Sequence, residues 1–187
     1  MKIGIDIDDT IGNFSETLLN YAFEYDKGLR NNGIINENKN LIDGKFDWTK
    51  EEYAYFYKTY IELTGHNMKP FPNVKEVIDY LRKKGNEIII ISARGNDYID
   101  AYDMTIKWLE KYKIKVDKIY LNISEKEKII KHENIDIFID DMPNICKIVS
   151  MLGVKTYIYS NKHNLEFNDE KIERINNWEE FIEKEGE

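Results

Sequence analysis

The sequence predicts an α/β fold in which helices cover both faces of a parallel β-sheet and a helical segment is inserted after the first strand. Three observations lead to this prediction. A short apolar run at residues 2–7 ends in acidic residues. A mostly helical, aromatic-rich stretch follows over residues 13–69. From residue 70 onward, apolar runs of strand length alternate with segments of helical periodicity, which is the pattern of a parallel sheet with crossover helices.

The first part of the chain is expected to hold one strand and two helices. The apolar run at residues 2–7 is a buried strand that ends in acid. A helix follows, because apolar side chains recur on one helical face; they are Phe14, Leu18, Tyr21, Ala22 and Tyr25. The Asn-rich residues 31–40 are typical of a loop. Thr49 and Glu52 have the spacing of a capping box, which starts the second helix.

Strands and helices alternate after Pro70 and Pro72, which interrupt helical structure and mark a boundary. Apolar runs predict strands at residues 87–91, 118–121, 136–139 and 154–159. Helical periodicity predicts helices between Asn73 and Gly85, over residues 98–112, after a capping-box pattern at Ser124 and Glu127, over residues 143–152 and over residues 178–182. We therefore predict an α/β core built from residues 1–12 and 70–187, interrupted by a helical cap of residues 13–69.

The composition is that of a globular chain with one main domain and room for an insertion. It has 187 residues, of which 42% are hydrophobic and 33% charged. The net charge of −8 disfavours a nucleic-acid polymer as partner, because affinity for the backbone depends on Lys and Arg that neutralise phosphates. A small anion is still compatible, since a metal ion and one or two cations reverse the field locally.

The sequence indicates a cytoplasmic location. Cys146 is the single cysteine, so no intrachain disulfide can form, which fits a reducing compartment; we expect it to be a small core residue. Acids at Asp6, Asp8 and Asp9 interrupt the N-terminal apolar stretch that a signal peptide would need. Apolar segments are too short to span a bilayer, so we expect no membrane partner.

Polar side chains follow several of the predicted strands. They are Asp6, Asp8 and Thr10 after the first strand, Ser92 and Arg94 after the next, and Asp140 and Asp141 after a later one. Ligands of open parallel sheets bind outside the carboxyl ends of the strands. We therefore expect residues far apart in the sequence to converge at one edge of the sheet.

The acidic segment after the first strand is the first candidate for catalysis. Residues two apart at a strand end can point the same way, so Asp6 and Asp8 would face one site while Ile7 stays buried. Clustered carboxylates repel one another unless a cation joins them, and hard oxygen ligands favour Mg²⁺. The alternative is a solvated acidic turn.

The other polar residues each have a structural alternative. Asp140 and Asp141 follow a buried strand, where carboxylates need a counter-ion, but acids also stabilise a helix N-terminus. Ser92 is a phosphate donor or a turn hydroxyl, and Arg94 is an anion clamp or a surface charge. Lys126 lies in the first turn of a helix, where a cation is unfavourable against the helix dipole. That placement indicates a use other than solvation.

Four short segments together resemble the four motifs of haloacid-dehalogenase-like (HAD) phosphatases: DIDDT, ISAR, Lys126 and IDD. The whole chain is similar to the 5'(3')-deoxyribonucleotidase branch through its early insertion and the segments FPNVKEVIDYLRKKG, DIFIDDMPN and INNWEEF. The resemblance implies a Rossmann-like HAD core and a Mg²⁺-dependent phosphatase. It also implies a small phosphorylated substrate, a nucleoside monophosphate.

The resemblance implies a role for each matching position. Asp6 would attack phosphorus and form an aspartyl-phosphate, while Asp8 would protonate the leaving oxygen and later activate water. Ser92 and Lys126 would hold the phosphoryl group, and we add Arg94, as the candidate anion clamp, to the predicted phosphate-binding residues. Lys128 lies two residues after Lys126 and is the alternative candidate for the phosphate-binding lysine.

The implied metal ligands are the Asp6 carboxylate, the Asp8 carbonyl oxygen and a late acid. Asp141 is favoured as the direct ligand, with Asp140 acting through water, and the choice between them stays open. Asp9 stands where many relatives carry Gly; it is expected to hydrogen-bond the turn, and we assign it no catalytic role.

The insertion would select the substrate, and it is dense in aromatic side chains that can stack on a base. Helical spacing explains one group as helix core: Tyr53, Phe56, Tyr57 and Tyr60. Phe46 and Trp48 fall outside that spacing, so they are the candidates for substrate contact. The histidines show no metal-ligand spacing and are expected at the surface; they are His66, His132 and His163.

Other function classes share parts of this pattern. A phospho-accepting receiver domain carries its acceptor after a middle strand, but here that strand ends in Ser92. A hydrolytic dehalogenase needs neither a metal nor an acid such as Asp8. A binding module without catalysis is disfavoured, because each expected catalytic position carries a competent side chain. Within the phosphatases, an enzyme for a sugar phosphate or another small metabolite is the alternative to a nucleotidase.

Overall fold

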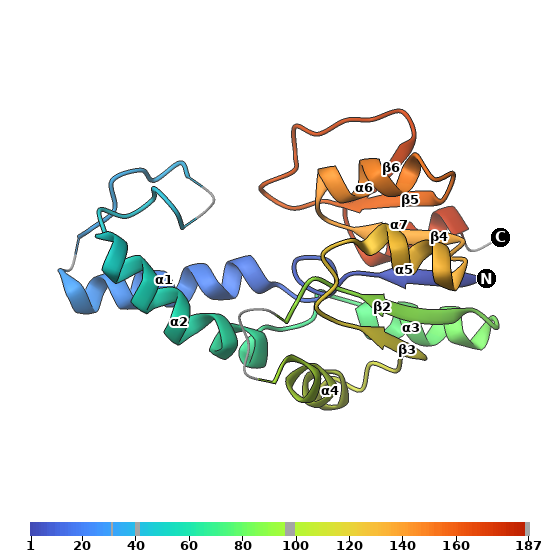
Figure 1. The fold of residues 1–187 in the computed structure, drawn as a ribbon, viewed down its shortest axis with the longest axis horizontal. Helices are drawn as coiled ribbons and strands as arrows, with labels where there is room; N and C mark the ends of the chain where they lie inside the picture. Colours follow the sequence, from blue (N-terminus) through green and yellow to red (C-terminus); the bar gives the residue numbers. More distant parts are fainter. Residues whose placement is uncertain (31, 40–41, 96–99, 186–187) are drawn as a thin grey trace.

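The computed structural model describes residues 1–30, 32–39, 42–95 and 100–185, and they form one sheet with helices on both faces (Figure 1). The strands are β1 (Lys2–Ile5), β2 (Glu87–Ile91), β3 (Lys118–Tyr120), β4 (Ile137–Asp140), β5 (Lys155–Tyr159) and β6 (Ile172–Ile175). Their order in the sheet is β3-β2-β1-β4-β5-β6, and neighbouring strands are parallel. The predicted α/β fold is confirmed.

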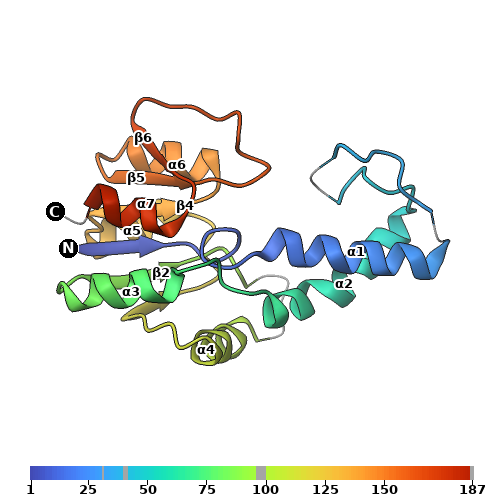
Figure 2. The same ribbon diagram turned by 180° about the vertical axis from the view of Figure 1, so that it is seen from behind.

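The helices are α1 (Phe14–Leu29), α2 (Lys50–Asn67), α3 (Val74–Lys83), α4 (Ala101–Lys111), α5 (Lys126–Glu133), α6 (Pro143–Ser150) and α7 (Trp178–Glu185). The first two extend away from the sheet, whereas the others pack around it (Figures 1 and 2). Within the described part of the chain, no helix is long and apolar enough to cross a membrane.

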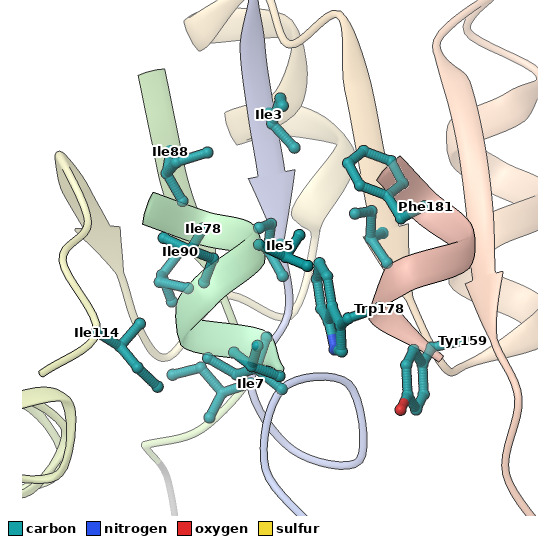
Figure 3. Close-up of a cluster of buried hydrophobic side chains, with 14 of the residues drawn as sticks. Ile3, Ile5, Ile7, Ile78, Ile88, Ile90, Ile114, Tyr159, Trp178 and Phe181 are labelled. Atoms are coloured by element: carbon teal, nitrogen blue, oxygen red, sulfur yellow. The ribbon is translucent and has the colours of Figure 1, made fainter. Parts of the chain in front are cut away.

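The two faces of the sheet belong to different hydrophobic clusters because strand side chains alternate between faces. In β2, Ile88 and Ile90 join one cluster, while Ile89 and Ile91 join another. On the first face, Trp178 of α7 and Ile78 of α3 lie against β1 (Figure 3). On the second face, Ile130 of α5 and Val149 of α6 pack on β2 and β4. Because both faces are covered, the central strands are apolar at almost every position.

Two local features differ from the sequence predictions, and a third prediction falls outside the described residues. Strand β6 was not predicted, because its two central residues, Glu173 and Arg174, interrupt its buried isoleucines and make it read as polar chain. The capping box expected at Ser124 is wrong, since α5 begins at Lys126 with no side-chain cap bond. Helix α4 begins at Ala101, and its predicted start at Tyr98 lies outside the described residues.

The insertion after β1 has a core of its own. Buried apolar side chains from α1, from the segment between the helices and from α2 form one cluster: Leu18, Ala22, Ile42, Phe46, Trp48 and Phe56. Asp26 of α1 is buried and accepts hydrogen bonds from the backbone NH of Gly33 (2.8 Å) and from Trp48 Nε1 (2.8 Å). The capping box of Thr49 and Glu52 at the start of α2 is confirmed.

Two backbone segments that run side by side connect the insertion to the sheet. We call them the stem, and they are residues 11–13 and 68–71. The Asn13 NH donates to the Lys69 carbonyl (2.9 Å), and the Phe71 NH donates to the Ile11 carbonyl (2.9 Å). Trp108 Nε1 of α4 donates to the carbonyl of Met68 (2.8 Å), which is fully buried. The end of α2 is therefore fixed to the core beside the carboxyl end of β1.

An ion-pair group joins three elements at the opposite edge of the sheet. Glu133 of α5 is buried and accepts hydrogen bonds from Lys118 Nζ (2.7 Å), Lys2 Nζ (3.3 Å) and the Tyr120 hydroxyl. These contacts, led by Lys118 and Tyr120, lower the pKa of Glu133 to about 2. Ionised Glu133 therefore ties α5 to β1 and β3.

We predict that Glu133→Gln lowers the free energy of unfolding by about 1–2 kcal/mol at neutral pH, the scale of hydrogen bonds to charged groups. Because the folded-state pKa lies below the ordinary 4.5, the stabilisation is present above that value and is lost as the pH falls through about 2. Urea unfolding at several pH values measures it, with exposed Glu170→Gln as the control. A difference between wild type and Glu133→Gln that does not shrink in acid would contradict this account.

Candidate active site

Asp6 lies at the carboxyl end of β1, in the middle of the sheet. Its backbone NH still pairs with the Ile139 carbonyl of β4 (3.0 Å), so the strand geometry continues to this residue. Its side chain is buried, with 5% of the residue exposed. Because β2 and β4 flank β1, the residues after those strands meet Asp6 at the same edge.

Lys126 forms a buried double ion pair with the acids at this edge. Its Nζ lies 2.6 Å from Asp6 Oδ1 and 2.7 Å from Asp140 Oδ2. Lys126 is the first residue of α5, and the two carboxylates compensate the unfavourable position of a cation at a helix N-terminus. Lys128, by contrast, is exposed and pairs with Glu125. The structure thus brings Lys126, and not its rival, to the predicted site.

Burial controls the ionisation of this group. It raises the pKa of Asp6 to about 7; Lys126 opposes this rise, and the carboxylates of Asp140 and Asp141 add to it. Burial also raises the pKa of Asp140. For Lys126, burial lowers the pKa, but Asp6 and Asp140 outweigh it and the pKa is raised. One buried ammonium therefore faces more carboxylate than it can neutralise.

The carboxylates of Asp6, Asp140 and Asp141 form a cluster with the donor set of a metal site. One oxygen from each lies within 4.8 Å of the others. Hard carboxylate oxygens in such a group suit Mg²⁺, and a divalent cation would supply the charge that Lys126 does not. These residues fit the ion that the sequence predicts.

Asp141 is held by Thr10 and by the loop after β5, a loop that the sequence analysis did not identify. Thr10 Oγ1 donates to its Oδ1 (3.3 Å), while Asn161 Nδ2 (3.1 Å) and His163 Nε2 (2.8 Å) contact its Oδ2. Asn164 Nδ2 donates to the Asp141 carbonyl (2.7 Å). The hydrogen bond to Asp141 raises the pKa of His163.

His163 is exposed at the surface, as expected, and it also contacts Asp141, which the sequence did not reveal. Spacing could not reveal it, because its partners lie on other elements. Only the position of this loop in the chain could have indicated the contact: residues 160–164 follow β5, whose carboxyl end lies beside that of β4.

Asp8 and Arg94 pair with each other through two contacts. Arg94 Nε donates to Asp8 Oδ2 (3.1 Å), and Arg94 Nη2 donates to Asp8 Oδ1. The guanidinium side chain is 0% exposed, whereas the Asp8 side chain is 26% exposed. Arg94 was expected to clamp phosphate, but in this structure the edge of its guanidinium is directed at Asp8.

Ser92 and Asp9 complete the polar lining. Ser92 is buried after β2, and its hydroxyl accepts a hydrogen bond from the Arg94 NH (3.3 Å). Asp9 adopts a positive φ of 58° and accepts from the Ser15 NH (2.8 Å) and the Ser15 hydroxyl. Burial raises the pKa of Asp9 to about 6, although the Ser15 hydrogen bonds oppose the rise. As expected, Asp9 stabilises the turn into α1.

These side chains surround a pocket of about 470 Å³ at the carboxyl edge of the sheet. Its lining combines the acids, Ser92, Arg94 and Lys126 with an apolar rim: Asp6, Asp8, Asp9, Ser15, Ser92, Ala93, Arg94, Ile123, Ser124, Lys126, Asp141, Met142, Asn144, Ile145 and His163. Asp140 is fully buried and lies behind this lining. The pocket can accept an anionic group over Asp6.

Phe46 and Trp48 are not brought to this pocket, which corrects their assignment to substrate contact. They are 2% and 6% exposed and stack on each other inside the insertion, with ring centroids 4.4 Å apart. They fall outside the helical spacing because the segment before α2 folds back over the two helices. Their burial and the Trp48 hydrogen bond to Asp26 make them core residues of the insertion.

Comparison with known proteins relates this chain to nucleotidases. The model of the family described as 5' nucleotidase, deoxy (pyrimidine), cytosolic type C protein (NT5C) matches residues 1–184. A Bacillus cereus protein called "Putative nucleotidase" is 30% identical over 97% of this chain and 96% of its own length. A Bacillus subtilis protein of similar name is 28% identical over 97% and 92%.

Solved structures agree on the fold. A haloacid dehalogenase-like hydrolase from Streptococcus pneumoniae superposes with a TM-score of 0.69 at 16% identity, covering 98% of this chain and 97% of its own. A HAD-superfamily hydrolase from Geobacter sulfurreducens has a TM-score of 0.65 at 14% identity, covering 98% of each. The resemblance to the HAD group that the motifs predicted is confirmed.

We predict that Lys126→Met lowers the free energy of unfolding by about 3 kcal/mol, because it leaves buried carboxylates without their cation. Lys128→Met removes an exposed pair and should change stability by less than about 0.5 kcal/mol. Urea unfolding of both variants without added divalent cation measures the difference. Similar values for the two would show that the buried ion pair does not hold the site together.

Proposed function

The chain belongs to the 5' nucleotidase, deoxy (pyrimidine), cytosolic type C family and is a phosphomonoester hydrolase, and we propose that it acts on nucleoside monophosphates through a phosphorylated Asp6. The observation that carries the proposal is the position of Asp6, buried against Lys126 at the bottom of a pocket that is open to an anion. We also infer that it works in the cytoplasm, which its single, buried Cys146 supports.

In the first step, an Asp6 carboxylate oxygen attacks phosphorus and the ester P–O bond breaks. The bonding electron pair goes to the leaving oxygen, which takes a proton from the carboxyl group of Asp8. Asp8 suits this role because it lines the pocket and is the more exposed partner of its ion pair. The products of this step are the released alcohol and an aspartyl-phosphate.

In the second step, water attacks the phosphorus of the aspartyl-phosphate. Asp8, now a carboxylate, takes a proton from that water as the new P–O bond forms. The bond between phosphorus and Asp6 breaks, and its electron pair restores the Asp6 carboxylate. Inorganic phosphate leaves, and Asp8 is again protonated for the next cycle.

Lys126 and Ser92 would hold the phosphoryl oxygens during both steps. Phosphoryl transfer depends on positioning and on neutralising charge at these oxygens. Lys126 lies against Asp6, so its ammonium is beside any phosphoryl group bound there. Ser92 lines the same pocket from the end of β2.

The acid cluster would hold Mg²⁺, which supplies charge neutralisation when it is bound. Asp6 and Asp141 are its side-chain ligands in this proposal, and the Asp8 carbonyl oxygen is a further one. Asp141 lines the pocket. Asp140 does not, and it is fully buried behind the lining. We therefore place Asp140 outside the direct ligands.

We further propose that residues 13–69 act as a cap on a core of residues 1–12 and 70–187. The stem supports this division, because two short, hydrogen-bonded backbone segments carry the chain between the sheet and the insertion. The cap begins at the pocket itself, where Ser15 of α1 is part of the lining.

A phosphatase of sugar phosphates or other small metabolites is the second candidate. The burial of Phe46 and Trp48 favours it, because these two rings offer no face on which a base can stack. Family membership favours the nucleotidase instead.

We predict that the purified chain hydrolyses nucleoside monophosphates, deoxy forms above all, with higher kcat/KM than sugar phosphates. Release of inorganic phosphate over a panel of both classes, assayed with Mg²⁺, measures this. Sugar phosphates as the better substrates would replace the nucleotidase by the second candidate. No hydrolysis of any ester would overturn the proposed function.

The control for this panel is Asp6→Asn. An amide of nearly the same shape cannot attack phosphorus, so turnover should fall below detection while the circular dichroism spectrum stays unchanged. A folded Asp6→Asn variant with substantial activity would contradict the covalent mechanism.

We predict that Mg²⁺ both supports turnover and stabilises the fold. At 100 times its Kd, a ligand that binds only the folded state adds about 2.7 kcal/mol, so Tm should rise with Mg²⁺. Asp141→Asn should lose most of this shift, whereas Asp103→Asn, at an exposed carboxylate on α4, should retain it. Full activity in chelator-treated protein, or an undiminished shift in Asp141→Asn, would show that the acid cluster does not bind the metal.

A further inference from the structure

We infer that Arg94 is a positioning residue that orients the carboxyl group of Asp8 and couples it to the end of the helical insertion. The inference rests on the proposed function, in which Asp8 is the acid and base. It replaces the expectation that Arg94 clamps the phosphate.

The contact between the two residues fixes the orientation of the Asp8 carboxyl group. Two neighbouring nitrogens of one guanidinium, Nε and Nη2, each meet a different oxygen of Asp8. Such a forked contact constrains the plane of the carboxyl group as well as its position. Asp8 keeps the exposed side of the pair, so the carboxyl group is held from behind while it faces the pocket.

A phosphate clamp through the Nε and Nη2 edge of the guanidinium would compete with Asp8. In a clamp, Nε and Nη2 would each point at a phosphate oxygen, but here they point at Asp8. The side chain of Arg94 has no solvent-exposed surface. Lys126 and Ser92 already supply a cation and a hydroxyl to the pocket.

Arg94 is itself held by the segments that follow β2 and β3. Its NH donates to Ser92 Oγ (3.3 Å), and its carbonyl accepts from the Asn122 NH (2.8 Å). The position of its backbone is therefore set by the sheet, and only the guanidinium end reaches across to the insertion.

Met68 connects Arg94 to the insertion. Arg94 Nη2 lies 3.2 Å from the sulfur of Met68, the fully buried residue at the end of α2. The Met68 NH bonds back to the Thr64 carbonyl (2.8 Å), and its own carbonyl accepts from Trp108 Nε1 (2.8 Å). Arg94 Nη2 thus contacts both Asp8 and Met68 of the stem. A shift of α2 would therefore move the guanidinium and, with it, the carboxyl group of Asp8.

The test compares two esters that differ in their need for a general acid. A nitrophenyl phosphate releases a stabilised phenolate, whereas an alkyl phosphate must have its leaving oxygen protonated. General acid catalysis contributes about 10²–10⁴-fold, so Arg94→Met should lower kcat/KM for the alkyl ester about 100-fold and that for the aryl ester less than about tenfold. The ratio kcat/KM is used because it covers the steps up to transfer to Asp6, before water enters.

Arg82→Met is the matched control. Arg82 makes the same kind of contact through Nε (3.3 Å) and Nη2 (2.6 Å), but with Asp117, away from the pocket. Arg82→Met should leave kcat/KM unchanged for both esters.

Arg94→Lys retains the positive charge but cannot make two parallel contacts with Asp8, so it should give an intermediate loss. This variant replaces Arg94→Met in the comparison if Arg94→Met does not fold. Met68→Leu, which removes the sulfur acceptor at similar volume, should lower the alkyl ratio more than the aryl ratio.

Equal losses for the two esters in Arg94→Met and Arg94→Lys would overturn the inference and return Arg94 to phosphate binding. A loss in Met68→Leu that is the same for both esters would overturn the coupling to the insertion. A wild-type chain that hydrolyses neither ester would overturn the proposed function and this inference with it, which separates the two failures.

Discussion

The double ion pair of Lys126 with Asp6 and Asp140 is the interaction on which the rest of the site depends. Parallel strands β1 and β4 lie side by side; Asp6 directly follows β1 and Asp140 ends β4, so the sheet alone would bury two carboxylates next to each other. Burial of unpaired charges is unfavourable by several kcal/mol per ion. The first turn of α5 places one ammonium within 2.7 Å of both. A third carboxylate, Asp141, leaves an excess of negative charge that a divalent cation can balance.

Much of this arrangement could be predicted because it follows from strand order and burial. The strands β1, β2 and β4 are apolar at nearly every position, since helices cover both faces of the sheet. Strong apolar runs reveal where such strands end, and therefore which polar residues lie at the carboxyl edge. The positions of Asp6, Ser92 and Asp141 followed from that rule together with the resemblance to HAD phosphatases.

The parts that could not be predicted are contacts between segments with no periodic pattern. Asn164 and His163 reach Asp141 from the loop after β5, and no spacing along the chain encodes that approach. Trp48 lies off the helical stripe and is still a core residue, because the segment that carries it folds over α1 and α2 and gives its indole NH to Asp26. A forked pair such as Arg94 with Asp8 spans 86 residues, so it becomes visible only in three dimensions.

The insertion uses its large aromatic side chains for its own stability, and this limits how it can select a substrate. A two-helix unit outside the main core must bury enough apolar surface to stay folded, and Phe46, Trp48 and Phe56 supply much of it. In the proposed function, recognition of the leaving group would therefore fall to side chains that line the pocket, such as Ser15, Met142 and Asn144. These short or flexible groups define a pocket more by charge and size than by stacking. In the mechanism we propose, the insertion would influence the site chiefly through its ends, which are fixed beside Asp8 and Asp9, rather than through its aromatic core.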